Sequence, residues 1–216
     1  MRLKGIIFDL DGTLGNTLPV CFAAYRSAFA QFLGRTYTDR EITALFGPSE
    51  EGIIQKLVPH QWQACLQTYL GVYEQVYAQY AEPFPGLEDA LRLLQQRGIA
   101  LAVVTGKGSQ SAAISLRYLG LADYFDAVET GSASGAIKPR SIRKVLAKWQ
   151  IPPHEVAYVG DTAYDLKAAI EAHVIPLGAA WAATAEVNNL KALAPLAVFD
   201  QVEDFTRWID HGFTGG

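Results

Sequence analysis

Several classes of protein are excluded by residue types that are scarce or absent in this chain. Its 216 residues include only two cysteines, Cys21 and Cys65, whose spacing fits no metal site, so we expect reduced thiols. The formal net charge is −4 and no basic stripe is present, which argues against a nucleic-acid partner. No apolar run is long enough to span a membrane, so no membrane partner is expected either.

The amino-terminal residues lack the pattern of a signal peptide, because Met1 leads directly into an apolar strand. Together with the reduced cysteines, this predicts a cytoplasmic protein. Hydrophobic residues make up 50% of the chain, as in a globular protein. A chain of this length can form one substantial core, or one core with a small accessory domain. We expect a monomer or a homodimer.

Residues 16–82 have the pattern of helices without a clear strand. Apolar residues recur at helical spacing from Leu18 to Leu33. Thr38 and Glu41 have capping-box spacing, which predicts a second helix that runs toward Phe46. Further helices are expected over 50–58 and 61–80. The prolines and glycine of residues 83–86 then predict a stiff connection between domains.

After this connection, strands and helices alternate. Strands are expected over 99–104, 125–128, 156–159, 175–179 and 197–199, and helices over 87–97, 109–119, 141–149, 162–172, 186–193 and up to 209. The alternation predicts a parallel sheet with helices on both faces. The fold class is therefore α/β, a doubly wound, Rossmann-like core over 1–15 and 83–216, with an inserted small α-helical domain over 16–82.

Residues 6–14, Ile-Ile-Phe-Asp-Leu-Asp-Gly-Thr-Leu, form the most informative stretch. An apolar run typical of a buried strand ends in Asp9 and Asp11, and Gly12 marks a turn. In open α/β sheets, ligands bind beyond the carboxyl ends of the strands. Two carboxylates there repel each other unless a proton or a hard cation such as Mg²⁺ lies between them. The simpler interpretation is a polar Asp-Gly turn.

Three further stretches lie near strand ends or in loops. In Val103-Val104-Thr105-Gly106-Lys107, the Thr105 hydroxyl and the following backbone amides could bind a phosphate. The sequence around Lys107 lacks the earlier glycine of a P-loop. Lys138-Pro139 follows the loop 131–136, and a lone loop lysine is usually solvated.

The last of these stretches, Gly160-Asp161-Thr162-Ala163-Tyr164-Asp165, follows a predicted strand and begins a helix. Asp161 and Asp165 are four residues apart, so both can lie on one side of the first helical turn. Carboxylates there also gain from the helix dipole. For Asp165, a solvated acid at a capped helix start is the simpler interpretation.

These stretches, in this order, resemble the four signatures of the haloacid dehalogenase-like (HAD) phosphohydrolase superfamily, of which the first is Asp-x-Asp-Gly-Thr. The resemblance extends from Asp9 to Asp165. The sequence is most similar to the phosphoglycolate phosphatase branch, partly through Gly47-Pro48-Ser49-Glu50-Glu51. The resemblance implies that residues 16–82 are a mobile cap over the active site of the HAD core.

The resemblance also implies roles for individual residues. Asp9 would be the nucleophile that forms an aspartyl-phosphate, and Asp11 would be the general acid-base. Mg²⁺ would bind Asp9, Asp161 and the backbone carbonyl of Asp11, with Asp165 as a ligand or in support. The substrate phosphate would contact Thr105, the Gly106 backbone amide and Lys138.

The implied function is a Mg²⁺-dependent phosphatase that hydrolyses a small phosphorylated metabolite such as phosphoglycolate. One alternative is a sugar-phosphate mutase similar to β-phosphoglucomutase, which returns the phosphoryl group to its substrate. Another is a catalytically silent binding protein on the same fold. The complete set of acidic and phosphate-binding residues argues against the silent protein.

Overall fold

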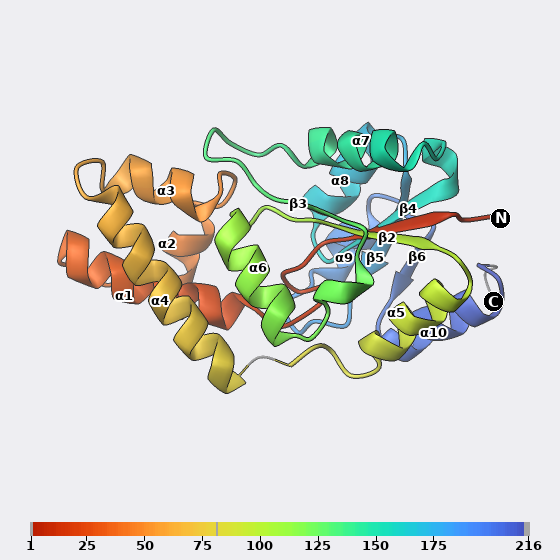
Figure 1. The fold of residues 1–216 in the computed structure, drawn as a ribbon, viewed down its shortest axis with the longest axis horizontal. Helices are drawn as coiled ribbons and strands as arrows, with labels where there is room; N and C mark the ends of the chain where they lie inside the picture. Colours follow the sequence, from red (N-terminus) through yellow and green to blue (C-terminus); the bar gives the residue numbers. More distant parts are fainter. Residues whose placement is uncertain (1, 81, 214–216) are drawn as a thin grey trace.

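The computed structural model describes residues 2–80 and 82–213, and its centre is a parallel six-stranded sheet (Figure 1). The strand order is β3-β2-β1-β4-β5-β6. The strands are β1 (Gly5–Phe8), β2 (Ala100–Val104), β3 (Ala127–Glu129), β4 (Val156–Gly160), β5 (Ile175–Ala179) and β6 (Ala197–Phe199). β1 lies between β2 and β4, and the chain winds outward from it in both directions. The predicted α/β, doubly wound fold class is therefore confirmed.

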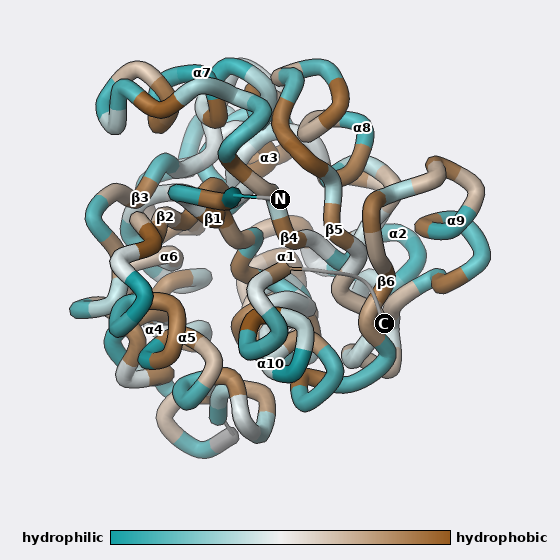
Figure 2. Tube along the Cα trace, turned by 90° about the vertical axis from the view of Figure 1, so that its right-hand side faces the viewer, coloured by the Kyte–Doolittle hydropathy of each residue, from teal (hydrophilic) through white to brown (hydrophobic). Residues whose placement is uncertain are grey.

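Helices cover both faces of the sheet. Figure 2 shows α7 and α8 on one side of the strands, and α5 and α10 on the other. The helices in this part of the chain are α5 (Leu87–Gln96), α6 (Ser109–Tyr118), α7 (Lys138–Trp149), α8 (Ala163–Glu171), α9 (Val187–Lys191) and α10 (Val202–Asp210). Side chains alternate along β1, so Ile7 packs in the core under α7 and α8, whereas Ile6 and Phe8 pack in the opposite core.

The first four helices lie together at one end of the sheet, at the left of Figure 1. They are α1 (Leu18–Leu33), α2 (Asp39–Thr43), α3 (Glu50–Leu57) and α4 (Trp62–Tyr80), and we call them the helical insertion. Tyr69, Tyr73 and Tyr77 repeat every four residues on α4 and form one buried stripe. Tyr69 packs against Tyr25 of α1, with ring centroids 4.6 Å apart.

Two chain segments connect the insertion to the sheet, and they lie side by side. Gly15 and Pro83 form an antiparallel bridge, and the Phe84 backbone N–H donates to Leu14 O over 3.4 Å. The predicted boundaries of the two domains remain a prediction. Residues 1, 81 and 214–216, which those ranges include, lie outside the described residues. Within the described chain, no helix combines the length and the apolar character needed to cross a membrane.

Most predicted elements are present, but some boundaries were wrong. The capping box of Thr38 and Glu41 is present, yet α2 ends at Thr43 rather than near Phe46. β3 begins two residues later than predicted, at Ala127. α7 begins at Lys138 instead of Ser141, with a proline in its first turn, where the missing N–H breaks no helical hydrogen bond.

Candidate active site

The ends of the three central strands bring distant parts of the sequence together. Phe8 of β1 lies opposite Val103 of β2 and Val159 of β4. Asp9, Thr105 and Asp161 therefore leave adjacent strands at the same edge of the sheet, and all three are buried. This is the carboxyl edge, where open α/β sheets bind ligands. The convergence predicted from the sequence is present.

Asp9, Asp161 and Asp165 form a buried acidic cluster. Each offers a carboxylate oxygen within 4.8 Å of the others. Burial raises the pKa of Asp9 to about 7 and that of Asp161 to about 9, and repulsion from Asp165 adds to both shifts. Carboxylates held so close require protons or a cation between them. Three oxygen donors of this kind fit a hard divalent ion such as Mg²⁺.

Lys138 supplies positive charge to this cluster. Its Nζ donates to Asp9 Oδ1 over 3.0 Å and also to Asp165 Oδ1. Burial disfavours the charged ammonium, but Asp165 and Asp9 outweigh that effect and raise the pKa of Lys138 well above its usual range. The simpler interpretation, a solvated loop lysine, was wrong because Lys138 is 7% exposed and begins α7.

Asp165 holds the cluster to the start of α8. It forms a capping box with Thr162, in which the Thr162 backbone N–H donates to Asp165 Oδ2 over 3.1 Å. Its other oxygen accepts from Lys138 and from the Tyr158 hydroxyl. The helix is capped, but the simpler interpretation, a solvated acid, was wrong, since the side chain of Asp165 is fully buried.

Two glycines allow the chain to pass this close to the acids. A Cβ on Gly12 would lie 2.1 Å from Asp161 Oδ2, and the φ of Gly12 is +75°, a conformation that favours glycine. A Cβ on Gly160 would lie 2.4 Å from the Cβ of Asp165. Both positions therefore have no room for a side chain.

The carboxylate of Asp11 makes different contacts from those of the acidic cluster. Asp11 Oδ1 lies 3.2 Å from Lys107 Nζ and accepts a hydrogen bond from the Thr17 hydroxyl, just before α1. Its side chain is 23% exposed. Asp9 and Asp11 thus have separate partners. Asp9 is paired with Lys138 of α7, whereas Asp11 contacts Lys107 and Thr17.

Lys107 is a site residue that the sequence analysis did not assign. It is 5% exposed, and its Nζ donates to Cys21 Sγ over 2.9 Å and lies 4.6 Å from the Tyr73 ring centroid. Burial opposes its charge, but Asp11 raises the pKa of Lys107 well above its usual range. Its position just beyond the end of a buried strand, at the edge of the sheet where ligands bind, could have identified Lys107 as a site residue.

The predicted phosphate-binding turn follows β2. The Thr105 hydroxyl is buried and accepts from the Lys107 backbone N–H over 3.2 Å, while Gly106 is exposed.

Both predicted cysteine thiols are free and buried, and burial raises the pKa of Cys21 to about 11, so its thiol is protonated. Cys21, which contacts Lys107, is therefore not a reactive thiolate.

Trp181, which follows β5, also contacts the loop after β1. Its Nε1 donates to Thr13 O over 3.0 Å, and the Thr13 hydroxyl lies 3.4 Å from Asp161 Oδ1. The sequence analysis gave Trp181 no role. The contact ties the loop that carries Asp11 to the end of β5, which is separated from β1 by β4 in the sheet.

Known proteins resemble this chain in both sequence and fold. The family model for haloacid dehalogenase-like hydrolases matches residues 6–179. Pyrophosphatase PpaX of Bacillus pumilus is 27% identical over 186 residues, which is 85% of this chain and 86% of that protein. Pyrophosphatase PpaX of Oceanobacillus iheyensis is 24% identical over 215 residues, 99% of this chain and all of that protein.

Solved structures share the fold over almost the whole chain. A protein from Haemophilus somnus described as a predicted phosphoglycolate phosphatase has a TM-score of 0.83 and 22% identity, covering 97% of this chain and 99% of its own. CbbY from Rhodobacter sphaeroides, solved in complex with phosphate, has a TM-score of 0.76 and 21% identity, with 93% and 95% covered. At these identities, the likeness concerns the fold.

Proposed function

This chain belongs to the haloacid dehalogenase-like hydrolases, and we propose that it hydrolyses the phosphate monoester of a small metabolite. The reaction uses Mg²⁺ and an aspartyl-phosphate formed on Asp9. One observation carries the proposal: Asp9, Asp161, Asp165 and Lys138 meet in one buried cluster at the carboxyl edge of the sheet. The names of the relatives, pyrophosphatase and phosphoglycolate phosphatase, support phosphoryl chemistry.

The charge of the cluster supports a divalent ion. Three carboxylates and one ammonium leave a net charge of −2 when all are ionised, which one Mg²⁺ would balance. Asp9 and Asp161 would hold the ion, together with the backbone carbonyl of Asp11, while Asp165 is already bonded to Lys138 and to its helix cap. Mg²⁺ would offset the negative charge of the nucleophile and of the phosphate.

Protein residues carry out the remaining steps of the reaction. The Asp9 carboxylate attacks phosphorus, and Lys138 keeps one of its oxygens oriented. Asp11, held by Thr17 and Lys107, gives a proton to the departing oxygen and later takes one from the attacking water. Thr105, with the Gly106 backbone amide and Lys138, binds the phosphate oxygens. Water then hydrolyses the acyl-phosphate.

The test is phosphate release with and without Mg²⁺. p-Nitrophenyl phosphate serves as a generic substrate, and phosphoglycolate, pyrophosphate and hexose phosphates as candidates. Asp9→Asn should abolish Mg²⁺-dependent release, whereas Asp200→Asn, a matched change at an exposed position, should not. Activity that survives Asp9→Asn would remove the nucleophile assignment. Isomerisation of a hexose phosphate without phosphate release would favour the mutase. If none of these compounds reacts, the catalytically silent protein is favoured.

A further inference from the structure

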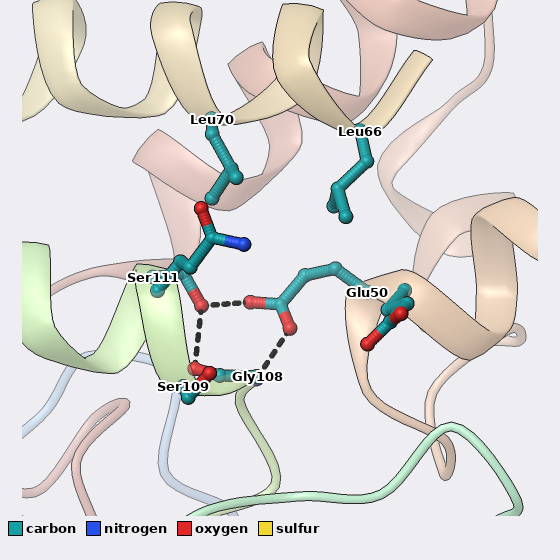
Figure 3. Close-up of a pocket in the computed structure, with 8 residues that line it drawn as sticks. Glu50, Leu66, Leu70, Gly108, Ser109 and Ser111 are labelled. Atoms are coloured by element: carbon teal, nitrogen blue, oxygen red, sulfur yellow. Dashed lines mark hydrogen bonds between the residues drawn. The ribbon is translucent and has the colours of Figure 1, made fainter. Parts of the chain in front are cut away.

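Another buried carboxylate, outside the acidic cluster, is that of Glu50, which reaches from the helical insertion to the start of α6. Glu50 begins α3 and is only 6% exposed. Its Oε2 accepts from the Gly108 backbone N–H and its Oε1 from the Ser111 hydroxyl, both at the start of α6 (Figure 3). Figure 3 shows the carboxylate between these two partners, with Leu70 of α4 nearby. Nothing in the proposed chemistry so far uses this charge.

The local sequence is suited to hold the carboxylate there. Gly108 is the N-cap of α6 and has no capping side chain of its own, so Glu50 caps the helix from another segment. A Cβ on Gly108 would lie 2.8 Å from Glu50 Oε2. The start of α3 is also docked closely, since Ser49 N donates to Ser132 O over 2.9 Å. A buried carboxylate needs such partners to be tolerated.

Glu50 lies on the leaving-group side of the proposed reaction. Gly108 directly follows Lys107, which is paired with Asp11, the proposed acid-base. The negative charge of Glu50 is close enough to contribute to the raised pKa of Lys107 and of Cys21. Because the departing oxygen takes its proton from Asp11, the rest of the leaving group extends toward these residues.

Without Glu50, this side of the site would be positive. The amino end of α6 favours an anion, and so does Lys107, whose ammonium lies 3.2 Å from Asp11 Oδ1. We propose that Glu50 cancels this positive charge and so makes the enzyme select substrates whose leaving group is uncharged, such as a sugar or another polyol. This inference rests on the proposed function.

The selection has a direct physical basis. A leaving group with a carboxylate or a second phosphate would meet the like charge of Glu50 in a partly dry site, where repulsion is strong. Hydroxyl groups meet no such repulsion, and a carboxylate can accept further hydrogen bonds beyond the two from Gly108 and Ser111. A mutase is disfavoured as well, since transfer of a phosphoryl group to a sugar phosphate creates a bisphosphate.

A matched pair of substrates tests the inference. 2-Hydroxyethyl phosphate and phosphoglycolate differ in having a hydroxymethyl or a carboxylate group on the same leaving carbon. We expect the wild type to have the higher kcat/KM for 2-hydroxyethyl phosphate. Glu50→Gln keeps the size of the side chain and should shift the ratio of the two kcat/KM values toward phosphoglycolate by about tenfold or more. Glu51→Gln, the same change one residue along, should leave the ratio unchanged, since Glu51 accepts from Gln55 within α3.

Each outcome is decisive. If Glu50→Gln lowers kcat/KM equally for both esters, the contact only holds the insertion in place and the inference is wrong. If the variant does not fold, as judged by circular dichroism, the wild-type ratio alone decides: a preference for phosphoglycolate overturns the inference. If wild type hydrolyses neither ester nor p-nitrophenyl phosphate, the proposed function fails, and this inference with it.

Discussion

Without a divalent cation, the folded protein should lose stability as the pH rises from about 5 to about 7. Burial raises the pKa of Asp9 to about 7 and that of Asp161 to about 9, from an ordinary value of 3.8. In the folded state these carboxyls keep protons that the unfolded chain releases at lower pH. Because the folded state binds more protons over this range, the free energy of unfolding falls as protons are withdrawn.

The size of the effect follows from the number of protons retained. Each proton that Asp9 and Asp161 retain lowers the free energy of unfolding by about 1.4 kcal/mol per pH unit, so one retained proton costs roughly 3 kcal/mol over the range and two cost roughly twice that. The lowered pKa of Glu41 and of Glu155 gives stability that is already present above about pH 5, so it does not change the sign. Lys138, with its raised pKa, stays charged throughout.

Urea unfolding at about pH 5, 6 and 7, with EDTA or with excess Mg²⁺, measures this effect. Stabilisation by Mg²⁺ should increase with pH, because protons compete with the ion for the same carboxylates. Asp161→Asn should weaken the pH dependence and remove most of the Mg²⁺ effect. A metal-free protein that becomes more stable toward pH 7, or an effect of Mg²⁺ that is the same at each pH, would refute this reasoning.

Three substitutions test other parts of the structure. Gly12→Ala places a Cβ 2.1 Å from Asp161 Oδ2, so kcat/KM should fall about a hundredfold and Mg²⁺ titration should show weaker binding. Lys107→Met leaves Asp11 without its cation, so urea unfolding should show a loss of ~1–3 kcal/mol, and kcat should fall more than KM changes. Glu74→Gln weakens two exposed contacts, the ion pair with Arg117 and the hydrogen bond from the Tyr118 hydroxyl, and should change stability by less than ~0.5 kcal/mol; a larger loss would mean that the contact between α4 and α6 depends on them.

Local signals in the sequence were sufficient for the strands and for the acids at their ends. The apolar run before Asp9 and the one before Asp161 predicted two buried strands, and parallel strands end at the same edge of a sheet. Helix ends were less certain, because they depend on single residues: Pro139 allowed α7 to begin at Lys138, and nothing local stopped the second helix at Thr43.

The sequence by itself determined the α/β class, the inserted helices and the acidic residues at the strand ends, since periodicity and turn residues act over short stretches of chain. Only the tertiary structure decided which polar groups from distant segments contact one another. Lys107 lies 86 residues from Cys21 in the chain and Glu50 lies 58 residues from Gly108. These pairs form because the helical insertion packs against α6, and packing between distant segments leaves no periodic trace in either one.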